Sequence, residues 1–426
     1  MELFLAISVF VIAYALIATE KFSRIAIALG GAAAMVIIGA TDADKAFYSH
    51  ATGIDWNVIF LLLGMMIIVG VVHKTGLFEF LAIKAIKRSK GNPKIALVYL
   101  AVLTAFASAI LDNVTTILLA VPMTIVVCKH LKVSPIAFIL TEVFVSNIGG
   151  AATLVGDPPN IIIASKANIS FNAFLIHMAP LVVVVLAVII PLLVYLFRGD
   201  LVNTQEDRLA IQKLDERTYI TDTLLLQKSL VVLSGVVIAF LSHSFLHLEP
   251  AIIALLGAGL LVGISGLKPR DYAMDVEWST LIFFSGLFIM VGALVNVGAL
   301  SRFSSYLGEL FAGNVMLASF SIVGISAVLS GVIDNIPYVA SMSPVVADLS
   351  VGLVGKQEHL LWWSLAFGAD FGGNATIIGA SANVVAIGLA AKAGIKISFW
   401  KFAKFGIPVT LISILMVYPY LYFFYF

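Results

Sequence analysis

Long apolar stretches separated by short polar segments run through the whole chain. A helix that crosses the hydrocarbon of a bilayer needs about 20 apolar residues. Stretches that reach or nearly reach this length lie at 3–19, 25–40, 56–72, 174–197, 226–243, 250–265, 278–295 and 401–425. This pattern predicts an all-α polytopic membrane protein.

Four further apolar stretches are interrupted near their middles by polar residues or by glycine and proline. Lipid offers no hydrogen bonds, so backbone that leaves helical geometry at membrane depth must line a polar cavity or be buried in protein. We therefore predict two re-entrant hairpins at 94–127 and 315–347, with arms too short to cross fully, and two broken helices at 134–168 and 360–391. The function is expected at these interruptions.

The chain contains two copies of one pattern. The matches are 54–60 with 276–282 and Asp112-Asn113 with Asp334-Asn335 at an offset of 222, and 149–153 with 372–376 at an offset of 223. Shared apolar composition alone does not reproduce the polar positions. The sequence therefore predicts repeat one at 1–197, a linker at 198–227 and repeat two at 228–426.

Each repeat is expected to cross the membrane five times, giving about ten transmembrane helices. An odd number of crossings inverts the second copy, as in many secondary transporters. The positive-inside rule then assigns the basic segments 20–24, 73–94, 128–133, 198–228, 265–277 and 391–404 to the cytoplasmic side. Outside them lie Lys45, Lys166, Arg302 and Lys356. We predict a cytoplasmic (inner) membrane protein with both termini outside, and interfacial helices at 76–90 and 298–311.

Composition excludes several classes of protein. The chain is 61% hydrophobic and 12% charged, whereas soluble chains are roughly a quarter charged. The single cysteine, Cys128, excludes a disulfide framework and a multi-thiolate site. No phosphate-binding loop, zinc-binding helix or serine elbow is present. We expect no enzyme activity, no cofactor, no metal centre and no nucleic-acid partner.

The hairpin tips carry acidic and amide side chains. Asp112, Asn113 and Thr115 form the first tip, and Asp334 and Asn335 form the second. A carboxylate at membrane depth costs roughly 2.5–3.5 kcal/mol on insertion scales, so a proton, a cation or a hydrogen-bonding solute must compensate. The alternative is that each Asp only caps the following helix.

The two helix breaks supply the remaining candidate residues for binding solute or ions. They are Asn147, Gly149, Gly150, Thr153, Asp157 and Asn160 in repeat one, and Asp370, Gly372, Gly373, Asn374, Thr376 and Asn383 in repeat two. Glycines and prolines predict that the helix is interrupted from Ser146 to Asn160. Facing helix ends offer carbonyls to cations and amides to anions. Because Asp370 replaces Asn147, we expect the half-sites to be chemically unequal.

Glu142 lies inside an apolar stretch and is not duplicated, since Leu365 occupies the matching position. Two interpretations stay open. Glu142 is either a buried protonatable relay or a residue near the interface that pairs with Lys129 or Lys132.

The sequence Gly156-Asp157-Pro158-Pro159-Asn160, the paired Asp-Asn hairpins and the Asn-x-Gly-Gly motif resemble the ion transporter superfamily. Within it the chain most resembles the arsenite permease family, which includes proteins like the melanosomal P protein. It is more distantly similar to D-type sodium/proton antiporters and divalent anion/sodium symporters. The resemblance implies a scaffold domain and a transport domain that move as an elevator, with hairpins and broken helices in the mobile part.

The expected function is export of arsenite or antimonite in exchange for protons, by alternating access. Asp112, Asp334 and Asp370 are the candidate proton carriers. No Arg or Lys is expected in either polar core, which disfavours dianionic substrates. The alternatives are a sodium/proton antiporter or an anion/sodium symporter; the repeated design argues against a channel or receptor. A soluble ATPase partner stays open, as does a homodimer, which is common among elevator relatives.

Overall fold

The computed structural model describes residues 1–19, 21–204, 215–246 and 248–426, and every regular element in these ranges is a helix. Repeat one holds α1 (Glu2–Ala18), α2 (Arg24–Ile37), α3 (Ala43–Tyr48), α4 (Trp56–His73), α5 (Leu77–Arg88), α6 (Pro93–Ile110), α7 (Asn113–Leu131), α8 (Ile136–Gly150), α9 (Pro158–Ala167) and α10 (Phe171–Leu196). A 3-10 turn, η1 (Glu216–Tyr219), follows. Repeat two holds α12 (Thr223–Leu241), α13 (His243–Leu246), α14 (Pro250–Ser265), α15 (Pro269–Ala273), α16 (Trp278–Asn296), α17 (Ala299–Phe311), α18 (Val315–Val332), α19 (Asn335–Leu349), η2 (Gly355–Gln357), α20 (Leu360–Gly372), η3 (Ile377–Gly379), α21 (Ser381–Lys392) and α22 (Phe399–Tyr425).

Short polar side chains start many of these helices. Ser170 accepts a hydrogen bond from the Ala173 amide at the start of α10, and Ser398 accepts one from Lys401 at the matching start of α22. Such caps satisfy amides that have no partner within the helix. The boundaries of the two copies therefore come from the same local chemistry.

The predicted single spans agree with the observed helices to within a few residues. By length and composition, eight helices of the described chain are suited to crossing a membrane. The hairpin arms correct one expectation, because α6 has 18 residues and α7 has 19. At 1.5 Å per residue each arm is about 27 Å long, so the arms are not too short to cross. Whether the hairpins are re-entrant depends on where their tips lie.

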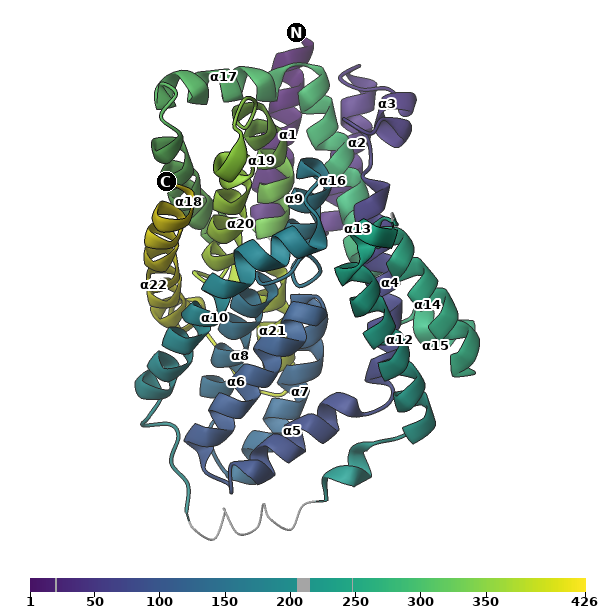
Figure 1. Cartoon of the computed structure of the whole chain (residues 1–426), viewed down its shortest axis with the longest axis vertical. Helices are drawn as coiled ribbons and strands as arrows, with labels where there is room; N and C mark the ends of the chain where they lie inside the picture. The colour runs from purple at the N-terminus through teal and green to yellow at the C-terminus, as the bar shows by residue number, and fades with distance from the viewer. Residues whose placement is uncertain (20, 205–214, 247) are drawn as a thin grey trace.

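The two repeats pack as inverted copies. Within repeat one α6 packs on α8, as α18 packs on α20 in repeat two, while α2 and α4 pack across the boundary on α16 and α14. The predicted interfacial helices exist as α5 and α17, and they lie at opposite ends of the molecule (Figure 1). Both chain termini lie toward the α17 end.

The segment between the repeats returns to α5. Residues 205–214 of the expected linker lie outside the described residues, and α12 already begins at Thr223. In η1 the Glu216 carboxylate lies 2.5 Å from the Lys87 ammonium of α5. This hydrogen bond holds the pKa of Glu216 below its usual range. The contact joins the linker to the surface of repeat one.

Candidate functional site

Each hairpin tip is a two-residue turn that ends in a capping aspartate. The Asp112 carboxylate accepts hydrogen bonds from the Thr115 amide, at 2.9 Å, and from the Thr115 hydroxyl. Asp334 accepts from the Ile336 amide at 3.2 Å. Both aspartates are buried. The expected capping role is therefore present at both tips.

The helix breaks are shorter than the sequence predicted. Helix α8 continues through Asn147 to Gly150, so only residues 151–157 are non-helical before Pro158 starts α9. The glycines serve close packing instead of breaking the helix. A Cβ at Gly149 would lie 2.3 Å from the carbonyl oxygen of Ala105 in α6.

The same close approach recurs in repeat two. A Cβ at Gly372 would lie 2.6 Å from the Ala327 carbonyl oxygen in α18. In both repeats the first hairpin arm thus packs backbone to backbone against the end of the half-helix. The second glycine of each pair packs against the break itself. Gly150 faces the Gly156 carbonyl, and Gly373 faces the Gly379 carbonyl.

The predicted threonines join each break to its hairpin. The Thr153 hydroxyl donates to the Ala109 carbonyl, and the Thr376 hydroxyl donates to the Gly331 carbonyl. Since each hydroxyl has one proton, these donors are used within the protein. Their role in the structure is to hold the breaks against the hairpins.

The predicted asparagines that follow each break close it into a loop. Asn160 donates through Nδ2 to the Gly150 and Thr153 carbonyls, and Asn383 donates in the same way to the Gly373 and Thr376 carbonyls. Both side chains are fully buried. Their amide protons are thus used by the backbone, which leaves the Oδ1 atoms to face the centre.

Both hairpin tips meet at Asp157. Its Oδ2 atom accepts from Nδ2 of Asn113 at 2.8 Å and from Nδ2 of Asn335 at 3.3 Å. The first hairpin lies on the α5 side of the molecule and the second on the α17 side (Figure 1). Because the tips come from opposite sides and touch one carboxylate, the hairpins turn back in the middle of the molecule, as a re-entrant hairpin does.

Asn147 connects the two breaks. Its Nδ2 atom donates to Oδ1 of Asn374 and to Oδ1 of Asn383, each at 2.9 Å, and its Oδ1 atom accepts from Asn113 at 3.3 Å. Asn374 in turn donates to the Phe144 carbonyl. These buried amides form a hydrogen-bonded network across the boundary between the repeats.

Asp370 occupies the position in repeat two that Asn147 occupies in repeat one, but its hydrogen bonding is not satisfied. It is fully buried, and neither carboxylate oxygen has a donor. It lies against Asn160, whose Oδ1 atom also lacks a donor. Asp157 adds a further buried oxygen without a partner, Oδ1. A proton on Asp370 would neutralise this buried carboxyl and give it an O–H donor.

A basic residue does reach the polar centre, which corrects the expectation that none would. The Arg24 guanidinium at the start of α2 lies 2.7 Å from Oδ2 of Asp334 and 3.1 Å from the Ser381 hydroxyl. The Tyr14 hydroxyl in α1 also contacts the Pro337 carbonyl of the same tip. In the sequence, Arg24 lies in the short segment between two predicted spans. Its contact with the second hairpin tip depends on how the helices pack, which the sequence pattern does not show.

Glu142 is buried and is not paired with a lysine. One carboxylate oxygen accepts from the Thr124 hydroxyl at 2.5 Å, and the other has no partner. Of the two interpretations, pairing with Lys129 or Lys132 near the interface is wrong.

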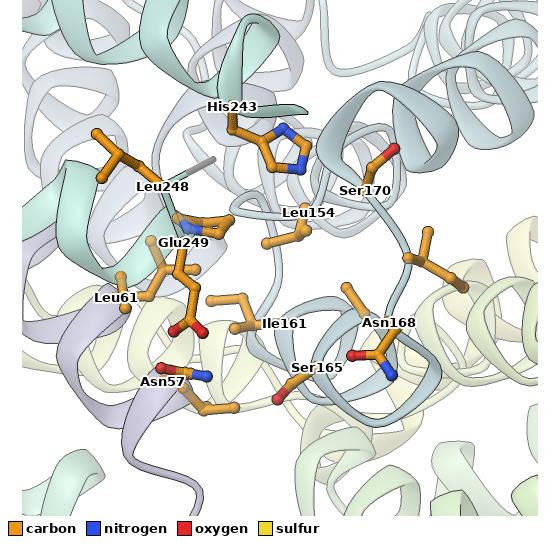
Figure 2. A pocket seen from close by; sticks show the side chains of 15 residues that line it. Asn57, Leu61, Leu154, Ile161, Ser165, Asn168, Ser170, His243, Leu248 and Glu249 are labelled. Carbon is orange, nitrogen blue, oxygen red and sulfur yellow. The ribbon is translucent and has the colours of Figure 1, made fainter. Parts of the chain in front are cut away.

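A cavity of about 380 Å³ borders the first break, and none of the predicted site residues lines it. Its walls include Asn57, Leu154, Ile161, Ser165, Asn168, His243 and Glu249. Glu249 and Asn57 lie on one side of it and Ser165 and Asn168 on the other (Figure 2). Since Leu154 and Ile161 directly follow Thr153 and Asn160, the cavity ends at the wall of the polar centre.

The family model CitMHS, described as "Citrate transporter", matches residues 14–368. A Mycobacterium tuberculosis protein named "Uncharacterized transporter Rv2684" is 51% identical over 424 residues, which cover 99% of this chain and 98% of that protein. The human P protein is 34% identical over 483 residues, covering 94% of this chain and 57% of that protein.

Among solved structures, the fold is similar to the Alcanivorax borkumensis YdaH transporter, whose crystal structure is described as having an unusual topology. The TM-score is 0.55 at 15% identity, with 91% of this chain and 86% of that chain covered. At this identity the likeness concerns the fold alone. It agrees with the predicted all-helical architecture of hairpins and broken helices.

Proposed function

This chain belongs to the citrate transporter family, and on that basis we propose that it is a secondary active transporter coupled to protons at Asp370. The observation that carries the proposal is Asp370, a fully buried carboxyl whose two oxygens both lack a hydrogen-bond partner. An ionised carboxylate buried without a partner is costly. One proton on Asp370 removes this charge, and its loss creates an unpaired charge that favours a different conformation.

The carboxylates of the centre then have different roles. Asp334 is neutralised by Arg24 and Asp112 is held by the Thr115 amide and hydroxyl. Neither is the preferred carrier, although both were candidates from sequence. Asp157 is the second proton carrier, because it joins both tips and keeps one oxygen without a partner.

For the solute, we propose arsenite and antimonite, exported in exchange for protons. Arsenous acid is neutral and carries three hydroxyls, which match a centre rich in acceptor oxygens. The Oδ1 atoms of Asn160 and Asp157 are such acceptors without donors. Thiolate binding is not required, and the only cysteine, Cys128, is buried outside the centre.

Arg24 favours a second candidate, a small carboxylate. A guanidinium pairs well with carboxylates, and Arg24 lies at the second hairpin tip beside Ser381. The family description, "Citrate transporter", points to the same class. The two candidates differ in the side chains that would contact the solute. A carboxylate would contact Arg24, whereas arsenous acid would contact the acceptor oxygens of Asn160 and Asp157.

Movement between the two sides would follow the elevator scheme. We propose that α1, α2, α4, α12, α14 and α16 form the scaffold and that the hairpins with α8, α9, α20 and α21 form the moving unit. The Arg24–Asp334 contact crosses this boundary. We propose the cytoplasmic membrane as the location, with the termini outside.

The test uses purified full-length protein in liposomes with an imposed pH gradient. Arsenite, antimonite, citrate and sodium are offered separately while the internal pH is followed. Proton movement with either metalloid, absent in Asp370→Asn and retained in the surface control Asp44→Asn, is expected. Movement with citrate alone would transfer the assignment to the carboxylate, and movement with sodium alone would make the protein a sodium/proton antiporter. Full coupling in Asp370→Asn would overturn the proton site.

A further inference from the structure

A further buried carboxyl, that of Glu142 in α8, lies away from the centre and faces both arms of the first hairpin. Glu142 is 1% exposed. Its Oε1 atom accepts from Thr124 of α7, while its Oε2 atom is buried without a partner. An ionisable residue at membrane depth is costly to keep unless it has a function. Nothing in the proton site at Asp370 uses it.

A small cavity adjoins this carboxyl. It measures about 20 Å³, enough for one water molecule. Its polar lining consists of Glu142, Thr104 of α6 and Thr124, and a water needs two to four such partners. Phe78 and Ala82 of α5 close it on the side of the interfacial helix. Glu142 therefore has a water-sized space directly beneath the surface helix.

Hydroxyl groups continue from this cavity toward the centre. On α6, Ser108 follows Thr104 by one helical turn. The Ser108 hydroxyl donates to the Ser146 carbonyl at 2.7 Å, and the Ser146 hydroxyl lies 3.1 Å from the Ser108 hydroxyl. The next residue of α8 is Asn147, about 7.5 Å along the axis from Glu142 at 1.5 Å per residue. Hydroxyl groups therefore lie along the stretch of α6 and α8 between Glu142 and the polar centre, with Thr104 and Ser108 one helical turn apart.

Repeat two lacks this arrangement. Leu365 occupies the position of Glu142, and Ala369 occupies that of Ser146. The α6 hydroxyls do have counterparts, because Ser326 and Ser330 of α18 match Thr104 and Ser108. Ser330 donates to the Ala369 carbonyl at 2.6 Å, as Ser108 does to Ser146, while Ser326 is hydrogen-bonded to the Tyr338 hydroxyl. Within the described residues, the acid and the α8 hydroxyl at this position belong to the first repeat alone.

The titratable groups around Glu142 are few. Helix α7 contributes Cys128, one helical turn after Thr124. Helix α5 carries Glu79, whose Oε2 atom is buried without a partner, and α6 adds Thr104 but no charged group to the cavity. No ion pair of the described chain includes Glu142. Within the described residues, no fixed cation therefore holds Glu142 in its ionised form.

We propose that Glu142 is a further protonation site, outside the polar centre, which relays protons between the α5 face and the Asp157–Asp370 centre. A hydronium entering the cavity gives one proton to the Glu142 carboxylate and leaves as water. The carboxyl then passes that proton to the cavity water, and each hydroxyl along Thr104, Ser108 and Ser146 accepts one proton and releases one. A centre carboxylate becomes neutral, and Glu142 is ionised again. The relay role rests on the proposed proton coupling, but the protonation of Glu142 does not.

The experiment first measures protonation without any transported solute. Infrared difference spectra of the purified protein between acidic and alkaline pH report the C=O stretch of protonated carboxyls. A band that disappears in Glu142→Gln, but persists in Asp370→Asn and in the surface control Glu309→Gln, is expected. If Glu142→Gln leaves every pH-dependent band unchanged, Glu142 does not titrate and the proposal is wrong.

The second measurement is the rate of proton movement in liposomes with an imposed pH gradient, using arsenite as the probe and citrate if arsenite is inactive. Glu142→Gln and Ser108→Ala are expected to slow it about tenfold or more and to flatten its pH profile. Ser330→Ala, the matched control, is expected to leave it unchanged, and Glu142→Asp to restore part of the rate. An unchanged rate and pH profile in Glu142→Gln would overturn the relay while the Asp370 site stands. Absence of proton movement in the wild type would instead contradict the proposed function and leave the infrared result to decide on Glu142.

Discussion

The Arg24 guanidinium lies 2.7 Å from the Asp334 carboxylate, although 310 residues separate them in the chain. The Asp334 side chain is 3% exposed and that of Arg24 is 27% exposed, so the pair is largely shielded from water. It joins the first repeat to the hairpin tip of the second. This contact explains how a carboxylate is tolerated at the second tip.

Removing Arg24 should therefore destabilise the protein more than removing both charges. Arg24→Ala is expected to cost about 3 kcal/mol, because it leaves Asp334 buried without its partner. Arg24→Ala combined with Asp334→Asn should recover much of that loss. Thermal unfolding of the detergent-solubilised variants measures the difference. Additive losses in the double variant would show that the pair contributes no coupling.

Asp370→Asn should stabilise the protein at alkaline pH while abolishing proton coupling. The new amide is neutral at any pH, so the cost of a buried charge without a partner is removed, by about 1–3 kcal/mol or more. At acidic pH the gain should vanish, because protonated Asp370 is also neutral. Unfolding temperatures across pH test this.

The opposite substitution in repeat one is the control. Asn147→Asp removes the donor to Asn374 and Asn383, so it should destabilise the protein, most strongly at alkaline pH. Equal stability of Asn147→Asp and wild type at all pH values would contradict the asymmetry of the two half-sites.

Gly149→Ala and Gly372→Ala should both impair folding, because the added methyl meets a hairpin backbone carbonyl at 2.3 Å and 2.6 Å. Overpacking of this kind costs typically about 1–3 kcal/mol, and backbone cannot move aside as a side chain can. Gly388→Ala in α21 is the control, since a Cβ there meets nothing within 4 Å. It should be neutral or stabilise by about 0.4–1 kcal/mol. The yield and unfolding temperature of the purified variants report the outcome.

Acidification should release the linker from α5. Because Lys87 lowers the pKa of Glu216 in the folded protein, the contact stabilises the docked linker above the ordinary value of 4.5 and is lost as the pH falls through the folded-state pKa. Hydrogen exchange of residues 216–219, corrected for the intrinsic effect of pH, should rise in that range. Glu216→Gln should exchange fast already at neutral pH and show no such step, and a step that persists in this variant would assign the release to another group.

Local sequence features were sufficient for the helices, and they singled out many of the polar residues that the fold brings together, but not Arg24. Apolar length predicted the spans, and the offset of 222–223 residues predicted which positions correspond. The extent of the breaks was predicted incorrectly. In the sequence, a glycine pair such as Gly149-Gly150 indicates an interrupted helix. In the structure the pair continues α8, and Gly149 lacks a Cβ because the backbone of α6 packs directly against it.

The sequence by itself determined the all-helical membrane fold, the duplication and the repeated polar positions, because these follow from hydrophobic length, spacing and residue type. Only the tertiary structure decided how the polar residues are used. Thr153, Thr376, Asn160 and Asn383 donate their protons to backbone carbonyls, Asp334 is paired with Arg24, and Asp370 is left without a donor. Hydrogen bonds and ion pairs depend on distances of about 3 Å between atoms far apart in the chain. Those distances are set by the packing of inverted repeats, which no local pattern specifies.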